Sequence, residues 1–147
     1  MNLSARELCR EEVPFVYHVY EQNRAVLHGE AISLEAWRDC VFGEEADPHE
    51  AHFIIVDGGS PAAWLKLNAL NEPDIWISML VVDRELQHQG IGRFAIRFAE
   101  QYAKDHGKRA VCVQTTKENA AAIALYLSCG YKKAPRTQSH QKFQKLL

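Results

Sequence analysis

The residues from Leu80 to Gly92 combine an apolar strand end, a short polar loop and two glycines that open a helix; they read Leu-Val-Val-Asp-Arg-Glu-Leu-Gln-His-Gln-Gly-Ile-Gly. Backbone N–H groups at the start of a helix are unpaired and point outward, and the helix dipole adds partial positive charge there. Gly90 and Gly92 allow a ligand to approach that backbone closely. The segment therefore predicts a site for an anion, most naturally a phosphate or pyrophosphate.

Two phosphate motifs and one plain alternative compete for this segment. A P-loop needs Gly-Lys-Ser/Thr before its helix, and the Gly-Arg-Phe at 92–94 does not supply it. A dinucleotide fingerprint is matched literally by Gly90, Gly92 and Ala95. That fingerprint requires a tight turn, however, whereas seven residues separate the strand from Gly90, and no acid ends the next strand at Thr115. The plain alternative is an ordinary loop before a helix that starts with glycine.

A third motif fits this segment together with a second one further along the chain. Gln87-x-x-Gly90-x-Gly92 resembles the Gln/Arg-x-x-Gly-x-Gly/Ala signature of the GNAT superfamily of N-acetyltransferases. Residues 119–131, Asn-Ala-Ala-Ala-Ile-Ala-Leu-Tyr-Leu-Ser-Cys-Gly-Tyr, resemble the family's Asn-x-x-Ala-x-x-Leu-Tyr-x-x-x-Gly-Phe/Tyr segment. The two segments lie about 30 residues apart with an expected strand between them, as in the family. The resemblance is close over roughly residues 75–134.

The resemblance implies that acetyl-CoA is the cosubstrate and that it binds where two central parallel strands, expected at 75–82 and 109–115, splay apart. The pantetheine arm would pair with the backbone near the end of the first strand, at Leu80, Val81 and Val82. The pyrophosphate would lie on the amides of Gln87, His88, Gln89, Gly90, Ile91 and Gly92. Arg93 would assist it or be a solvated helix arginine, and Asn119 would bind the pantetheine arm or be only a first-turn helix residue.

The resemblance also assigns Tyr126 as the acid that protonates the departing CoA thiolate. Tyr126 lies seven residues after Asn119, about two helical turns, so both share one helix face. An unperturbed phenol, with a pKa near ~10, is a feasible proton donor to a thiolate. The alternative is an aromatic side chain packed between helix and sheet, a role we also expect for Tyr131.

The sequence lacks an obvious general base. Many family members carry a glutamate on the strand before the signature or on the next strand, and the matching positions here are Trp76, Ser78 and Gln114. A water chain to Asp74 or Glu72, or the histidine His88, could accept the proton instead. The remaining possibility is an amine whose own pKa is low, because an α-amino group near ~8 loses its proton more easily than a lysine near ~10.4. We favour the water chain or the low amine pKa, and expect His88 only to cover the phosphate loop.

The charge distribution bears on the acceptor. Residues 1–75 carry 5 Lys and Arg against 14 Asp and Glu, a net charge of −9, and residues 76–147 carry 12 against 5, a net charge of +7. In the family the acceptor site is built largely from the first two helices, their loop and later strands. Its acidic residues either form a solvated loop or attract a cationic amine; they cluster at Glu44, Glu45, Asp47 and Glu50.

Large aromatic side chains could line the same acceptor site, although we expect at least two of them to be core residues: Trp37, Phe42, Trp64 and Trp76. We therefore expect a small amine, amino-acid derivative, polyamine or peptide N-terminus as acceptor. An acidic acceptor half repels phosphates, which speaks against nucleic acid. The alternative from a different class is a module that binds acyl-CoA without turnover; the missing glutamate favours it, and Tyr126 argues against it.

Composition limits the remaining possibilities. The chain has 147 residues, 47% hydrophobic and 24% charged, which predicts one globular domain over 1–147. Its longest apolar run, at 75–82, is too short to span a membrane, and no apolar signal core begins the chain, so we expect a cytoplasmic protein. The four cysteines form no CxxC pair, and no Cys/His cluster has zinc spacing, so no metal site is expected.

The elements that must position these residues follow from hydrophobic periodicity and turn residues. We expect helices at 11–25, 34–42, 90–106 and 118–129, and strands at 3–8, 51–56, 62–70, 75–82, 109–115, 131–134 and 138–146. This order predicts an α/β fold with a mixed sheet of six to seven strands and about four helices. On strand 62–70 the face with Trp64, Lys66 and Asn68 is expected to be the wetter one. The last strand, with Phe143, Leu146 and Leu147, could lie at the edge of a homodimer.

Overall fold

The computed structural model describes residues 1–27, 29–135 and 139–147. Seven strands form one mixed sheet in the spatial order β1-β2-β3-β4-β5-β7-β6; they are β1 Leu3–Glu7, β2 Ala51–Asp57, β3 Ser60–Asn68, β4 Asp74–Val82, β5 Ala110–Thr116, β6 Lys132–Lys133 and β7 His140–Leu146. The helices are α1 Val13–Leu27, α2 Leu34–Phe42, α3 Ile91–Asp105 and α4 Ala120–Ser128, with short 3-10 turns η1 at Arg10–Glu12 and η2 at Arg84–Leu86. The predicted α/β class and element order are confirmed.

Local capping explains where the first two helices begin. The Glu12 carboxylate accepts the Cys9 backbone N–H at 2.9 Å and separates the turn η1 from α1. Helix α1 therefore begins at Val13 rather than at residue 11. Helix α2 begins after Ser33, whose hydroxyl accepts the Ala36 N–H at 3.1 Å, as its sequence predicts. The predicted start of the last strand, Gln138, lies outside the described residues, and β7 is described from His140.

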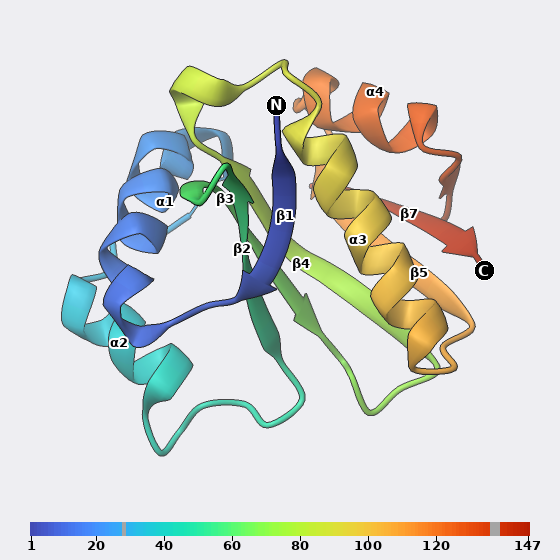
Figure 1. The fold of residues 1–147 in the computed structure, drawn as a ribbon. Coiled ribbons are helices and arrows are strands. Elements are labelled where there is room, and N and C mark those ends of the chain that lie inside the picture. Colours follow the sequence, from blue (N-terminus) through green and yellow to red (C-terminus); the bar gives the residue numbers. More distant parts are fainter. Residues whose placement is uncertain (28, 136–138) are drawn as a thin grey trace.

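The helices cover the two faces of the sheet separately (Figure 1). Helices α1 and α2 pack on one face in a cluster that includes Trp37 and Trp64. Helices α3 and α4 pack on the other face against strands β3, β4 and β5. Trp64 is fully buried, so the expectation of a wetter face is wrong at this residue. The reason is Trp37 of α2, whose ring meets the Trp64 ring edge-on with centroids 5.0 Å apart.

The two central parallel strands separate halfway along their length. Strands β4 and β5 pair only from Asp74 to Ile77 and from Ala110 to Val113. Beyond that point β4 continues along β3, while β5 continues along β7. The β3–β4 register shifts at this level, and Ser78 is the extra residue on β4. A bulge increases the local twist of a strand, which helps β4 to turn away from β5.

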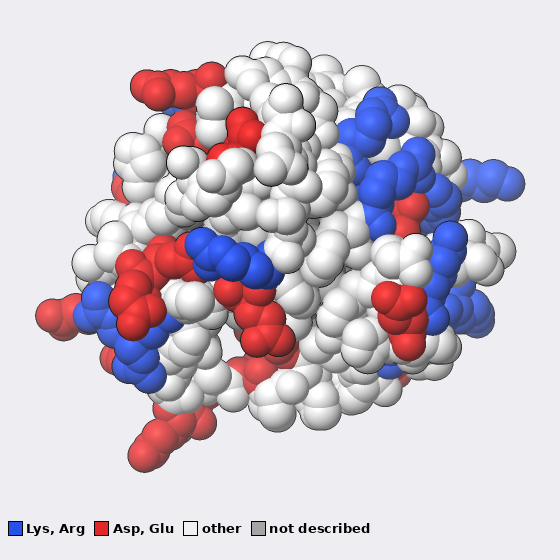
Figure 2. All heavy atoms as spheres, viewed as in Figure 1, with Lys and Arg blue, Asp and Glu red and all other residues white. Residues whose placement is uncertain are grey.

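The order of the last strands bears on the expected dimer edge. Strand β7 lies between β5 and β6, and Phe143 is fully buried, whereas Leu146 and Leu147 are exposed, so a homodimer contact at this strand stays a prediction. The edge is the short strand β6, which pairs only with residues 143–144 of β7. Within the residues described, no helix is both long and apolar enough to cross a membrane. Figure 2 shows Asp and Glu mainly over the α1–α2 side and Lys and Arg mainly over the side of α4 and β7.

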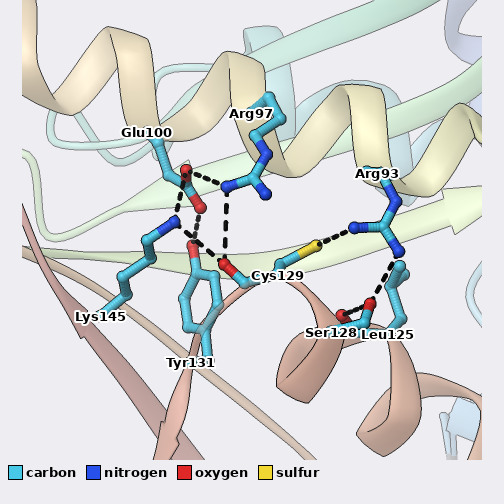
Figure 3. A network of polar contacts seen from close by, with 8 residues as sticks. All are labelled: Arg93, Arg97, Glu100, Leu125, Ser128, Cys129, Tyr131 and Lys145. Atoms are coloured by element: carbon cyan, nitrogen blue, oxygen red, sulfur yellow. Dashed lines mark hydrogen bonds and ion pairs between the residues drawn. The ribbon is translucent and has the colours of Figure 1, made fainter.

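A buried carboxylate joins α3 to the strands that follow α4 (Figure 3). Glu100 of α3 is only 5% exposed. It accepts hydrogen bonds from the Tyr131 hydroxyl at 3.0 Å, from Arg97 Nη1 at 3.0 Å and from Lys145 Nζ at 3.1 Å. Burial, together with the Glu100 carboxylate, raises the pKa of Tyr131, so the phenol remains the donor. Since Tyr131 follows α4 and Lys145 lies on β7, the network fixes β7 and the segment after α4 against α3.

We expect Glu100→Gln to lower the free energy of unfolding by about 2 kcal/mol, because removing one charge of a buried network leaves its partners poorly paired. The cost stays below that of a fully buried pair since Arg97 and Lys145 are partly exposed. Urea denaturation measures the change. The same substitution at exposed Glu44 should change stability by less than about 0.5 kcal/mol. Equal effects at both positions would contradict a structural role for the network.

Candidate active site

The first half of the loop between β4 and α3 is anchored by side-chain and backbone hydrogen bonds. The Asp83 carboxylate accepts the Glu85 N–H at 3.2 Å and starts the turn η2. The Gln87 amide donates to Asn23 Oδ1 of α1 at 3.2 Å and to the Val82 carbonyl at 3.3 Å. The Arg84 backbone N–H donates to Gln22 Oε1 of α1 at 3.2 Å. The loop therefore leans on α1 and on the end of β4.

The backbone of this loop presents free donors at the start of α3. His88 has φ 64° and Gly90 has φ 87°, and both values lie in the left-handed region. The first helical bond of α3 runs from the Phe94 N–H to the Gly90 carbonyl at 3.0 Å. In the described parts of the chain, the N–H groups of the preceding residues 91–93 have no acceptor. This geometry fits the predicted anion site.

Two residues at the start of α3 serve its packing against α4. A Cβ atom on Gly92 would lie 3.1 Å from Leu125 Cδ2, so glycine permits the close approach of the two helices. The Arg93 guanidinium donates to Ser128 Oγ at 2.8 Å and contacts Cys129 Sγ at 3.6 Å (Figure 3). The structure thus gives Arg93 a role in joining α3 to the end of α4. Its contact with pyrophosphate stays a prediction.

The end of β4 has one free edge. Leu80, Val81 and Val82 pair with β3 on one side, and their other side faces the gap that β5 leaves after Val113. Five residues of β4, 78–82, lie beyond the parallel pairing. A free strand edge offers backbone N–H and C=O groups to an added extended chain. The pairing of a pantetheine arm predicted for Leu80 to Val82 has the necessary geometry.

Helix α4 carries the two remaining predicted residues. Asn119 caps the helix, and its Oδ1 accepts the Ala122 N–H at 3.2 Å. Tyr126 packs into the core, with its ring centroid 5.8 Å from that of Phe143 and 6.1 Å from that of Tyr131. Burial raises the pKa of Tyr126 to about 12, so the phenol is not the unperturbed one that the sequence suggests. It remains protonated at any pH the protein meets.

The three positions at which the sequence lacks a glutamate line one cavity. Trp76 and Ser78 of β4 and Gln114 of β5 face a space of about 420 Å³, which Asn68, Ala69 and Ile77 complete. The cavity lies where β4 and β5 begin to separate. Ser78 belongs both to this cavity and to the free edge of β4. The expected acceptor side of the reaction therefore adjoins the expected donor side, and none of the lining residues carries a charge.

The carboxylates suggested as distant bases are poorly placed. Asp74 accepts two hydrogen bonds from Arg109, at 2.9 and 2.7 Å, and one from Gln144 at 3.1 Å. The Arg109 guanidinium lowers the pKa of Asp74. Asp74 also lies four residues before Ser78, roughly 13 Å along an extended strand. Glu72 and His88 are exposed, and neither lines the cavity. No group of three His, Cys, Asp or Glu placed for a metal occurs in the described ranges.

The family now follows from this geometry and from one direct comparison. A model of the family described as "Acetyltransferase (GNAT) family" matches residues 8–131. The chain belongs to this family. The match includes the loop between β4 and α3 (the anion loop, residues 83–90), the separating strands and Tyr126, so the resemblance noted in the motifs is confirmed. The protein is an N-acetyltransferase, and acetyl-CoA is its cosubstrate.

Known proteins of similar sequence and fold have diverse acceptors. The ribosomal protein bS18-alanine N-acetyltransferase of Escherichia coli strain K12 is 25% identical over 124 residues, covering 84% of this chain and 76% of that protein. The spermidine N-acetyltransferase of Vibrio cholerae, solved with CoA and spermine, has a TM-score of 0.88 at 18% identity over 99% of this chain and 95% of that chain. The PaiA N-acetyltransferase of Thermoplasma acidophilum, solved with coenzyme A, has a TM-score of 0.80 at 16% identity and full coverage of both chains.

The sequence singled out three of the cavity residues, and the roles of Asn119 and Tyr126 stay predictions; it did not single out Asn68 and Lys142. Asn68 lines the cavity because the bulge at Ser78 places it beside Trp76. Lys142 of β7 lies over the Trp76 ring, with Nζ 5.1 Å from the centroid. Of the four aromatic residues considered for an acceptor wall, Trp76 lines the cavity, whereas Trp37 and Trp64 are buried core residues. The alternation of side chains along β7 could have indicated the face on which Lys142 lies. The order of the strands, which places β7 beside β5, could not be read from the sequence.

We expect Gly90→Ala to weaken CoA binding about tenfold, measured by calorimetry. A Cβ meets no atom within 4 Å at this position, but φ +87° is strained for any L-residue by roughly 1–2 kcal/mol. The loop relaxes and its amides turn away from the phosphates. Gly107→Ala is the matched control, since φ is +69°, space is open, and the residue follows the far end of α3. Equal loss of affinity in both variants would contradict an anion site at Gly90.

Proposed function

We propose that this acetyltransferase moves the acetyl group of acetyl-CoA directly to a primary amine held in the cavity beside the strand gap. One observation carries the proposal: Ser78 belongs both to the cavity and to the free edge of β4. A pantetheine arm paired along Leu80 to Val82 and a pyrophosphate on residues 87–92 would bring the thioester to Ser78. Donor and acceptor then meet without a covalent enzyme intermediate.

The attack needs a neutral amine and a stabilised oxyanion. A free N–H group of β4 beyond Ile77 is available for the oxyanion, since this edge lacks a strand partner. The amine nitrogen forms a bond to the thioester carbonyl carbon, the carbon–sulfur bond then breaks, and the sulfur leaves as a thiolate. The amine also loses one proton, which passes to water because no carboxylate lines the cavity.

Tyr126 is the proposed proton donor to the CoA thiolate. It lies on α4, two helical turns after Asn119, which we propose binds the pantetheine arm. Its pKa of about 12 keeps the hydroxyl protonated, so in the proposed reaction it donates that proton to the thiolate released when the carbon–sulfur bond breaks. The acceptor class that these features support is a primary amine of a small molecule, an amino-acid derivative or a peptide N-terminus. Similarity to an alanine N-acetyltransferase acting on a ribosomal protein supports the last of these.

We expect acetyl-CoA turnover, read as free thiol, to depend on one class of amine in a panel of amino acids, short peptides, polyamines and aminoglycosides. Tyr126→Phe should lower kcat by roughly 10²-fold or more, with CoA affinity unchanged. Tyr102→Phe removes a hydroxyl from a partly buried tyrosine of α3 that packs against the same core cluster, and it should leave kcat unchanged. Thiol release by none of the amines, with tight binding of acetyl-CoA, would contradict acetyl transfer and support a binding module.

The pH dependence of kcat/KM should follow the acceptor and not the protein. Because the cavity holds no carboxylate, the rate rises with the fraction of neutral amine and levels off above the amine pKa. Since the pKa of Tyr126 is about 12, its loss of a proton produces no decline below about pH 11. Profiles between about pH 6 and pH 10 should therefore shift when an acceptor of different amine pKa is used. One common midpoint for all acceptors would show a base on the protein instead.

A further inference from the structure

Two carboxylates that could attract a cationic acceptor are already held by basic side chains, and the sequence does not show this pairing. These carboxylates belong to Glu50 and Asp74. Glu50 lies 3.2 Å from Lys66 Nζ and 3.5 Å from His52 Nε2. Asp74 is held by the fork of Arg109. Neither carboxylate is free to bind an ammonium group, and neither lines the cavity.

Lys142 carries the opposite charge at the rim of the same cavity. It stands opposite Gln114 in the β5–β7 register, and its Nζ lies 5.1 Å from the centroid of the Trp76 ring. Gln114 and Trp76 both line the cavity. In the described parts of the chain, no carboxylate oxygen lies within 4.0 Å of Lys142 Nζ. Asp74, the carboxylate that Lys142 affects at longer range, is itself held by Arg109, so the rim presents a half-buried ammonium with no ion pair of its own among the described residues.

We propose that Lys142 binds a carboxylate of the acceptor, so that the acceptor is a primary amine with a carboxylate a few bonds away. This inference rests on the proposed acetyl transfer at the same cavity. The Trp76 face fixes the ammonium by a cation–π contact, and an ammonium binds carboxylates through strong charge-assisted hydrogen bonds. The amides of Gln114 and Asn68 line the cavity and supply further neutral donors. The amine end then lies toward Ser78 and the thioester.

The exposed acidic loop does not cancel this preference. Glu44, Glu45 and Asp47 are exposed, and none of them lines the cavity. A polyamine would place a second ammonium near Lys142, where like charges repel, whereas an acceptor with both an amine and a carboxylate places its negative end there. The proposal therefore departs from the cationic acceptor that the charge of residues 1–75 suggests.

Two sources could supply this chemistry: a free amino acid, or a peptide whose first residue is acidic. Two pairs of acceptors distinguish them. One pair is alanine and alanine amide, and the other is the dipeptides Asp-Ala and Asn-Ala, both as C-terminal amides. Each pair changes only a carboxylate to an amide. The kcat/KM of each acceptor is measured by thiol release, for the native protein and for variants. Because the amine pKa of an acceptor is the same for every variant, ratios between variants report on Lys142 alone.

We expect Lys142→Gln to lower kcat/KM at least tenfold for the carboxylate member of one pair, through KM, and to leave its amide partner unchanged. Lys142→Arg should retain most of the preference, because it keeps the charge. Lys104→Gln removes the same charge from an exposed position on α3 and should change neither acceptor. Thermal unfolding of each variant confirms that the fold is kept.

An equal loss for both members of each pair in Lys142→Gln would overturn the inference, as would no loss for either member. Faster turnover of a polyamine such as spermidine than of every carboxylate acceptor would also overturn it. Each of these three results still requires acetyl transfer to an amine. If no amine in either panel releases thiol, the proposed acetyl transfer itself fails, so the two failures are told apart by the native protein alone.

Discussion

The end of backbone pairing between β4 and β5 is the constraint on which the site depends. Parallel strands normally satisfy each other's N–H and C=O groups along their length, but here the pairing stops at Ile77 and Val113. β4 still runs five residues further, held by β3 alone on one side. The unpaired edge, the anion loop after it and the cavity beside Ser78 all follow from this one separation. The proposed pairing of the pantetheine arm with this edge would complete the hydrogen bonding that β5 leaves open.

The elements around the gap support it from both faces of the sheet. On one face α3 and α4 pack closely through Gly92 and Leu125. Arg93 joins α3 to the end of α4, and Glu100 joins α3 to β7. On the other face α1 supports the loop through Asn23 and Gln22, which bind Gln87 and Arg84, while the N–H groups of residues 91–93 have no acceptor in the described parts of the chain. A rigid base and an open backbone are what a phosphate site needs, because the donors are then already oriented before the ligand arrives.

The chemistry of the cavity is set by what surrounds it. Uncharged residues line it, Glu50 and Asp74 are held in ion pairs, and Tyr126, the proposed proton donor, lies on α4 with its phenol buried. Such a site does not take a proton from the amine itself, so it favours acceptors that lose the proton easily. A buried phenol with a pKa of about 12 keeps its proton, so in the proposed reaction it is still protonated when the thiolate forms.

The sequence by itself determined the elements, the loop and the order of the two motifs, since these depend on residues close together in the chain. Gly90 needs a left-handed backbone, Ser33 and Asn119 cap helices, and hydrophobic periodicity places the strands, all through local interactions. Only the tertiary structure decided that Trp64 lies beneath Trp37, that Arg93 contacts α4, that burial raises the pKa of Tyr126 to about 12, and that Lys142 lies over Trp76. Each of these depends on which distant segments lie side by side, and strand order, one bulge and desolvation are not written in local spacing.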